Sequence, residues 1–362
     1  METSVRSAIE SVIDPDIGRS FGELGAVESV KIDGNSVEIY LELVPPLHYV
    51  GLAIDDACRD VVRSIMGDSV KTTVFVRPKA IPRIAQADVL PDVQTIIAVA
   101  SGKGGVGKST VAANIAAALA QKGASVGLLD ADIYGPSAPM MFDLANETMR
   151  AEKLPDGSVI GYPNERYGVK IASIGFVMQR DQAAILRGPM LAGYFTTLVG
   201  QMQWGALDFL IFDLPPGTGD IQLTLTQRIP LTGAAIVTTP QEIAVSDVRR
   251  SVAMFRRVNV DVLGVIENMS WFSPPDMPEK KYPIFGEGGG RAVAAESGAP
   301  LLGEIPITLA TREGGDEGLP VVLNPDEFRQ AEIIRNITAN LVRESRRAHA
   351  KRLGGQTVSI TL

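Results

Sequence analysis

Cysteine, histidine and tryptophan are scarce in this sequence of 362 residues, which contains one cysteine, two histidines and two tryptophans. A single cysteine, Cys58, excludes an internal disulfide framework and fits a reducing compartment. The first residues lack the apolar core of a signal peptide, and no later run approaches the roughly 18 apolar residues of a membrane span. We therefore expect a cytoplasmic protein with no membrane partner.

Acidic residues outnumber basic ones. The chain has 42 aspartates and glutamates but 34 lysines and arginines, which gives a formal net charge of −8. This balance argues against a nucleic-acid partner, because nucleic-acid phosphates attract basic surfaces. Hydrophobic residues make up 45% of the chain. That content, at this length, allows a large core and more than one domain.

The most informative stretch runs from Ser101 to Thr110 and reads SGKGGVGKST. It fits the phosphate-loop pattern G-x-x-x-x-G-K-[ST], and it lies between an apolar run fit for a strand, 95–100, and a helical pattern, 110–122. Glycines let such a loop aim its backbone N–H groups at phosphates, and the positive end of the following helix attracts the same anion. The predicted nucleotide-binding residues are Gly102, Lys103, Gly104, Gly105, Val106, Gly107, Lys108, Ser109 and Thr110.

Two side chains of this loop have specific chemistry. The Lys108 ammonium can reach the β- and γ-phosphates, and the Ser109 hydroxyl can ligate Mg²⁺. An ordinary glycine-rich turn would explain Gly104 and Gly105, but not a lysine and a hydroxyl at this spacing. The sequence therefore predicts a site for a nucleoside triphosphate and Mg²⁺.

Carboxylates follow two further predicted strands. Asp130 and Asp132 come at the end of the apolar run 125–130, and Asp213 ends the run 208–213, which has the Walker B pattern. Carboxyl ends of parallel strands meet at one edge of a sheet, beside the phosphate loop. We expect Asp132 to orient the attacking water, and Asp130 and Asp213 to organise Mg²⁺ and its waters. A plain strand-end cap is the alternative for Asp130 and Asp132.

Several motifs resemble one protein superfamily. Lys103, directly after the first glycine, resembles the deviant phosphate loop of the MinD/ParA superfamily of P-loop NTPases. The stretch Asp213–Asp220, DLPPGTGD, resembles its Mrp/ApbC branch of iron–sulfur cluster carriers, as does Glu267-Asn268-Met269-Ser270. Arg187-Gly188-Pro189 also resembles a family motif, to which we assign no role.

This resemblance covers nearly the whole chain, and it implies an ATPase that works as a homodimer. It implies that Lys103 crosses to the partner's nucleotide and acts in catalysis with Lys108 and Asp132. It also implies that Asn268 recognises the adenine edge and that Pro306 lines the other side of the base. A turn-forming asparagine at a strand end is the alternative for Asn268.

The pattern of apolar residues divides the chain into four parts. Residues 1–76 follow the order helix, strand, strand, helix, strand, which predicts a small α+β domain. This part resembles the domain fused ahead of Mrp/ApbC-type carriers. Residues 77–93 contain three prolines and favour an extended linker. Residues 94–350 alternate strands and helices, which predicts an α/β domain with a doubly wound, mostly parallel sheet, and 351–362 are a tail.

The chain differs from many members of this family in its cysteine residues. Many members have a Cys-x-x-Cys pair where this chain has Pro274 and Met277. A [4Fe–4S] cluster generally requires four thiolates, whereas a homodimer offers two Cys58 residues in a predicted buried helix. External thiols or a partner's cysteines could still complete such a site.

Two functions therefore stay open. The chain is either an ATPase that serves iron–sulfur cluster assembly or transfer, with apo client proteins as partners, or a nucleotide-switched dimeric binding protein without a cluster. A DNA-associated partitioning protein is disfavoured by the acidic balance.

Overall fold

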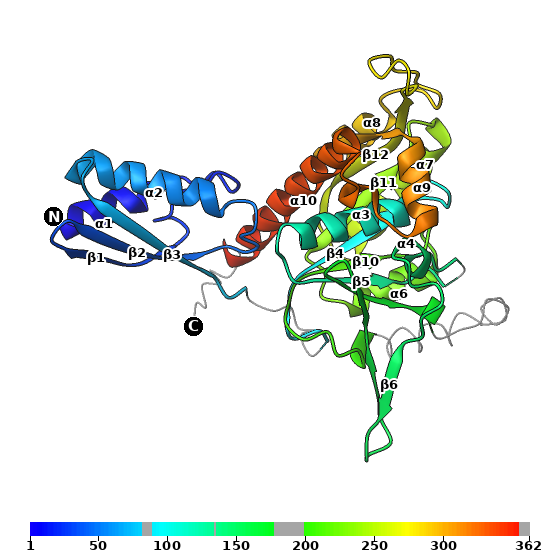
Figure 1. Cartoon of the computed structure of the whole chain (residues 1–362), viewed down its shortest axis with the longest axis horizontal. Helices are drawn as coiled ribbons and strands as arrows, with labels where there is room; N and C mark the ends of the chain where they lie inside the picture. Colours follow the sequence, from blue (N-terminus) through cyan, green and yellow to red (C-terminus); the bar gives the residue numbers. More distant parts are fainter. Residues whose placement is uncertain (82–88, 134, 177–198, 355–362) are drawn as a thin grey trace, which may run out of the picture. The chain divides into compact units, whose positions relative to one another are not determined.

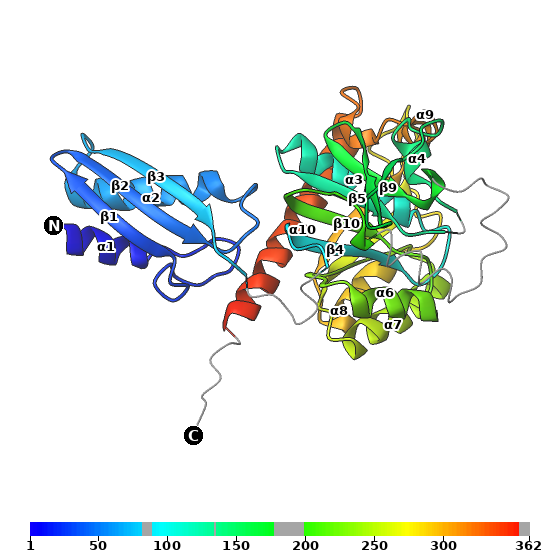
Figure 2. The ribbon, with the colours of Figure 1, turned by 90° about the horizontal axis from the view of Figure 1, so that it is seen from below.

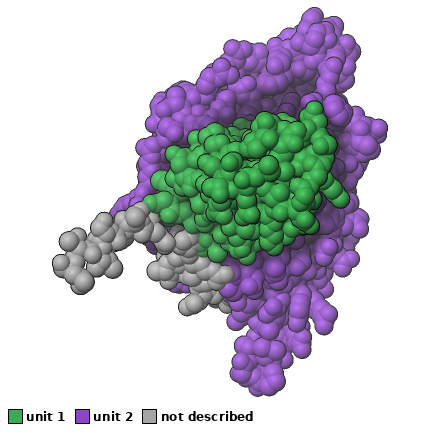
Figure 3. Space-filling model, turned by 90° about the vertical axis from the view of Figure 1, so that its left-hand side faces the viewer, with its two compact units in different colours: residues 1–82, 342–362 green, residues 83–341 purple. Residues whose placement is uncertain are grey.

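The computed structural model describes residues 1–81, 89–133, 135–176 and 199–354 (Figure 1). Contacts divide the chain into two compact units, one of Met1–Pro82 with Val342–Leu362 and one of Arg83–Leu341 (Figure 3). The sequence pattern placed residues up to 350 in the larger domain, whereas these contacts group residues 342–350 with the smaller unit. The boundary predicted at 350 is corrected accordingly.

The smaller unit has the predicted order of elements. Its three-stranded sheet has the order β1-β2-β3, in which β1 and β2 are antiparallel and β2 and β3 are parallel. Alternate residues of β2 are buried and pack with apolar residues of both helices in one core. The elements are α1 (Glu2–Glu10), β1 (Val27–Asp33), β2 (Ser36–Leu43), α2 (Gly51–Met66) and β3 (Lys71–Pro78).

The last turns of α10 (Phe328–Gly354) belong to this smaller unit because of one buried arginine. Arg346 is fully buried and donates hydrogen bonds to the carboxylates of Asp14 and Asp16 and, at 3.0 Å, to the carbonyl oxygen of Val44. A buried guanidinium requires such partners, because burying an unpaired charge costs several kcal/mol or more. These contacts fix residues 342–350 in the smaller unit.

The larger unit contains an eight-stranded sheet with the order β13-β12-β11-β4-β10-β5-β9-β8. Its strands are parallel to their neighbours except β8, which is antiparallel to β9. The predicted mostly parallel, doubly wound sheet is confirmed. The strands are β4 (Val93–Ser101), β5 (Val126–Asp130), β8 (Asn164–Arg166), β9 (Val169–Ser173), β10 (Leu207–Asp213), β11 (Gly233–Thr238), β12 (Val262–Phe272) and β13 (Leu301–Ile307).

Helices cover both faces of this sheet (Figure 2). Because both faces are covered, the central strands are buried apolar runs rather than alternating ones. One face has α3 (Lys108–Gln121), α4 (Ala138–Met141), α9 (Leu309–Glu317) and the first part of α10, with the short helices η1 (Ile174–Phe176) and η3 (Val321–Leu323). The other face has α6 (Asp220–Arg228), α7 (Glu242–Arg257) and α8 (Gly289–Ser297).

A hairpin of β6 (Arg150–Lys153) and β7 (Val159–Tyr162) projects from the larger unit (Figure 1). The sequence pattern does not predict this hairpin. All four residues of β6 are exposed, so its sequence shows no alternation of buried and exposed positions. None of the described helices is long and apolar enough to cross a membrane.

Candidate nucleotide-binding site

The structure has the predicted strand, loop and helix around residues 102–107, with β4 ending at Ser101 and α3 beginning at Lys108. Gly105 and Gly107 have φ angles of +79° and +78°, which only glycine adopts readily. At Gly102 a Cβ would lie 2.4 Å from the carbonyl carbon of Asp247 in α7. Both backbone conformation and close packing therefore require glycine in this loop.

Lys108 is the buried cation of the site. Its side chain is 5% exposed, and its ammonium group forms an ion pair with the buried carboxylate of Asp213, at the end of β10. Its Nζ also lies 3.2 Å from Oγ of Ser109. Because a buried ammonium needs an anionic partner, Asp213 neutralises Lys108 in this structure.

Asp130 lies opposite Asp213 on the neighbouring parallel strand, β5. Its two carboxylate oxygens accept hydrogen bonds from the backbone N–H groups of Asp132, Ser137 and Ala138 and from the Ser173 hydroxyl, at 2.9–3.1 Å. Burial, followed by the nearby Asp213 carboxylate, raises the pKa of Asp130 to about 7. Asp130 thus holds the backbone of Asp132, Ser137 and Ala138 at the end of β5.

Asp132 lies two residues after Asp130 and is partly exposed, so the structure brings the three predicted acids to one edge of the sheet. Within the described ranges, no group of three or more histidine, cysteine, aspartate or glutamate side chains could hold a metal ion. Mg²⁺ at a phosphate site commonly uses one or two protein ligands plus phosphate and water oxygens. Ser109 beside Asp213 fits that requirement.

Lys103 faces α7 of its own chain. Its Nζ lies 3.3 Å from Oε1 of Gln241, the residue that precedes α7. The lysine is therefore held within one chain in this structure, and its predicted role across a dimer interface stays a prediction.

Asn268, on β12, has a role that the sequence did not reveal. Its Nδ2 donates a hydrogen bond to the carbonyl oxygen of Val106 at 2.8 Å, and it is 8% exposed. A Cβ on Gly107 would lie 2.3 Å from the same nitrogen. Asn268 thus fixes the shape of the phosphate loop, and its predicted contact with adenine stays a prediction.

A mostly apolar pocket lies beside the first turns of α3, between this helix, β13, α9 and α10. Asn268 and Ile305 line it, and Pro306 follows Ile305 directly. The carbonyl oxygen of Pro306 accepts a hydrogen bond from Nε2 of Gln330 at 3.4 Å. The other lining residues include Thr110, Asn114, Thr311 and Gln330. The two residues expected around the base thus lie near one pocket, whereas Arg187-Gly188-Pro189 lies outside the described residues.

Comparison with known families identifies the chain. A family model described as NUBPL iron-transfer P-loop NTPase matches residues 92–342, and one described as iron-sulfur cluster assembly protein matches residues 2–74. The chain belongs to the NUBPL-type iron-transfer P-loop NTPases. The family predicted from the phosphate loop and the motif DLPPGTGD is thereby confirmed.

Relatives of this P-loop NTPase extend over both units. It is 44% identical to the iron-sulfur cluster carrier protein of Synechocystis, over 93% of this chain and 96% of the relative. It is 42% identical to the protein of the same name from Aquifex aeolicus, over 91% of this chain and 93% of that relative. These alignments include the small N-terminal domain.

Among solved structures, the larger unit is similar to a nucleotide-binding protein of Archaeoglobus fulgidus in complex with ADP. The TM-score is 0.57 with 36% identity, over 68% of this chain and 97% of that chain. The cell division ATPase MinD of Pyrococcus furiosus, at 22% identity and a TM-score of 0.50, supports the fold alone.

The family name suggests an iron–sulfur cluster, but this NTPase does not have the cysteine ligands for one. Cys58 is fully buried in α2, as predicted, and burial raises the pKa of its thiol to about 12. Pro274 and Met277 form a turn in which the Met277 N–H donates to the Pro274 carbonyl at 3.0 Å. A protonated, enclosed thiol and a thioether are not the four thiolates of a [4Fe–4S] cluster. The residues of this chain do not fit the cluster.

Proposed function

We propose that this chain binds ATP with Mg²⁺ at residues 102–110 and hydrolyses it to serve iron–sulfur cluster assembly or transfer. The buried Lys108–Asp213 pair behind a glycine loop is the observation that carries the proposal. A lysine at the start of a helix, behind a glycine loop whose N–H groups attract anions, is placed to meet the negative charge of a phosphate chain. The family and the names of the relatives support the cluster role.

The mechanism follows from the charges of the site. When the triphosphate enters, Lys108 exchanges its contact with Asp213 for the β- and γ-phosphates, and the α3 N-terminus adds backbone N–H donors. Ser109 and Asp213 are the residues that would hold Mg²⁺, the hydroxyl as a ligand and the carboxylate through water. When bound, the metal would supply positive charge to offset the charge that develops on the phosphate oxygens.

Asp132 orients the attacking water in this proposal. The backbone N–H of Asp132 donates a hydrogen bond to Asp130, so the backbone of Asp132 is held at the edge of the sheet. Preorganised placement of this kind lowers the barrier because no reorganisation is needed as the water attacks.

The cluster is cargo that this chain helps to move without enclosing it in its own thiolates. Partner cysteines or external thiols supply the missing ligands, and ATP sets when the partners engage. The alternative function, a nucleotide-switched dimeric binder with no connection to clusters, is favoured by the same missing ligands.

Anaerobic reconstitution tests the missing cluster ligands, and a cluster-transfer assay separates the two functions. We expect the wild-type chain to retain negligible iron and sulfide, and the Pro274→Cys/Met277→Cys double variant to gain both if these positions lie where relatives hold a cluster. In a second assay, a loaded donor passes its cluster to an apo acceptor. Acceleration by wild type that requires Mg–ATP supports the cluster role, and the Lys108→Ala variant is the control. Absence of acceleration would leave only the nucleotide switch.

A further inference from the structure

Gln222, the third residue of α6, is a buried side chain without a partner. It is 1% exposed, and both Oε1 and Nε2 lack any hydrogen-bond partner among the residues that the structure describes. A side-chain amide has two donor hydrogens and an accepting oxygen, and enclosing all of them unpaired costs free energy. Methionine would fill the same space without this cost, so the unpaired amide needs an explanation.

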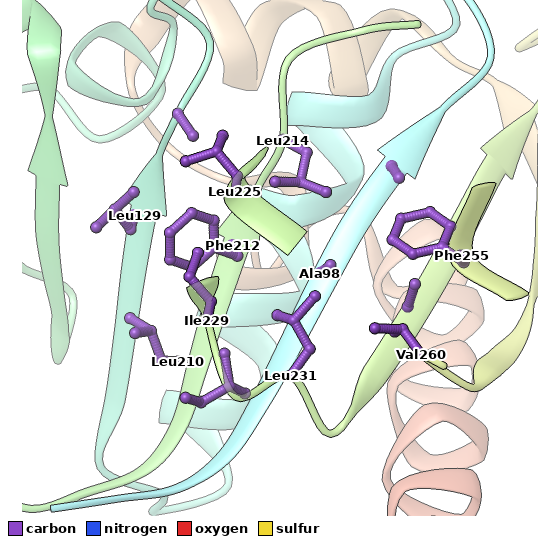
Figure 4. Close-up of a cluster of buried hydrophobic side chains, with 14 of the residues drawn as sticks. Ala98, Leu129, Leu210, Phe212, Leu214, Leu225, Ile229, Leu231, Phe255 and Val260 are labelled. Atoms are coloured by element: carbon purple, nitrogen blue, oxygen red, sulfur yellow. The ribbon is translucent and has the colours of Figure 1, made fainter. Parts of the chain in front are cut away.

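The position of Gln222 in α6 relates it to the nucleotide-binding edge. It shares a helix face with Leu225 and Thr226, three and four residues on, which are also buried. Leu225 packs beside Phe212 and Leu214 in the core below α6 (Figure 4). Gln222 therefore lies one turn nearer to the start of α6, toward the edge of the sheet where β10 ends.

The loop that leads into α6 adjoins the phosphate loop. It spans residues 214–219, between Asp213 and the helix, and the Gly217 N–H donates to the carbonyl oxygen of Ser101 at 3.1 Å. Pro215 and Pro216 have no N–H. The backbone of this loop therefore has fewer donors with which to form the hydrogen bonds that would stabilise a different conformation. A neighbouring side chain that both donates and accepts can provide those bonds.

We propose that Gln222 is a positioning residue for ATP hydrolysis. Its amide stays unpaired in the nucleotide-free chain and forms hydrogen bonds with the backbone of residues 214–219 when the triphosphate draws this loop toward the phosphate loop. The free energy that the unpaired amide costs is recovered when these hydrogen bonds form, so they favour the nucleotide-bound arrangement of residues 214–219. This inference rests on the proposed ATPase function.

The test compares Gln222→Met with wild type in full-length protein. We expect kcat for ATP to fall about 10- to 100-fold, because misplacement of backbone beside the reacting phosphates has effects of this size, while KM changes less than about twofold. We also expect the nucleotide-free melting temperature of the variant to equal or exceed that of wild type, because the unpaired amide is gone. Thr226→Val, one turn along the same buried face, should leave kcat unchanged.

Equal kcat in wild type and Gln222→Met would overturn the inference, since an ordered water would then satisfy the amide in both states. If wild type itself shows no hydrolysis, the proposed function fails instead, so the two failures are distinguishable. Hydrogen exchange of wild type gives a test that needs no variant. Residues 214–222 should exchange at least several-fold more slowly with Mg–ATP than with Mg–ADP, and equal exchange would contradict the proposal.

Discussion

Asp130 shows at the scale of a single residue what the sequence could and could not reveal about this site. Its place at the end of a buried strand was sufficient to predict a carboxylate beside the phosphate loop. Three of its four hydrogen bonds were not predictable, because their donors lie farther along the chain, at Ser137, Ala138 and Ser173. The same limit applies to Asn268, whose contact with Val106 joins residues 162 positions apart.

Asp130 should make the stability of the nucleotide-free chain depend on pH. Its folded-state pKa of about 7 lies above the ordinary value of 3.8, so between these values the folded chain retains a proton that the unfolded chain has released. The stabilisation linked to this proton is therefore complete below pH 4 and is lost as the pH rises to 7.

Urea unfolding of wild type and Asp130→Asn, followed by tryptophan fluorescence, measures this effect. Both tryptophans, Trp204 and Trp271, lie in the larger unit. The unfolding free energy of wild type relative to the variant should decrease by on the order of 1 kcal/mol per pH unit between pH 5 and 7. A difference that is constant with pH would show that Asp130 is ionised throughout.

At the scale of elements, α10 shows what a helical pattern leaves open. Its apolar residues recur at helical spacing, and basic residues near its end are typical of a helix C-terminus. The structure instead buries Arg346 against Asp14, which is 332 positions away in the sequence. Periodicity identifies the buried face of a helix, but it does not identify the segment that covers that face.

Replacement of Arg346 should destabilise the smaller unit. In Arg346→Met the carboxylates of Asp14 and Asp16 lose their buried partner, which typically costs about 3–5 kcal/mol. Arg343→Met removes a half-exposed partner of Asp16 and should cost less than about 1 kcal/mol. Hydrogen exchange of the β1 and β2 amides reports this unit alone. Equal protection in both variants would contradict a structural role for the buried pair.

At the scale of the whole molecule, the sequence predicted the two domain types because long elements have strong periodicity. The alternation of buried strands and helices after residue 93 led directly to the parallel sheet. The segment with β6, β7 and β8 was missed, because strands of three or four mostly exposed residues have no clear pattern. The missing cluster ligands were visible in the sequence, since one cysteine cannot supply four thiolates.

Assembly of two chains is the property that Lys103 should control. If its side chain leaves Gln241 to reach a partner's nucleotide, Lys103→Ala should bind ATP but stay monomeric with Mg²⁺ and a non-hydrolysable ATP analogue. Light scattering coupled to size exclusion measures the mass of each species. Lys153→Ala, which changes an exposed lysine of β6, is the control. Dimerisation of the Lys103 variant to the same extent as wild type would contradict the cross-subunit role.

The claim on which the whole account depends is that the loop 102–109 binds a nucleoside triphosphate through Lys108. Titration calorimetry of Mg–ATP into the purified chain tests it most directly, with Lys108→Ala as the comparison and thermal unfolding as a check that the variant is folded. The account predicts saturable heat with one site per chain for wild type and none for the variant. Absence of heat from wild type, or equal affinity in a folded Lys108→Ala variant, would contradict it.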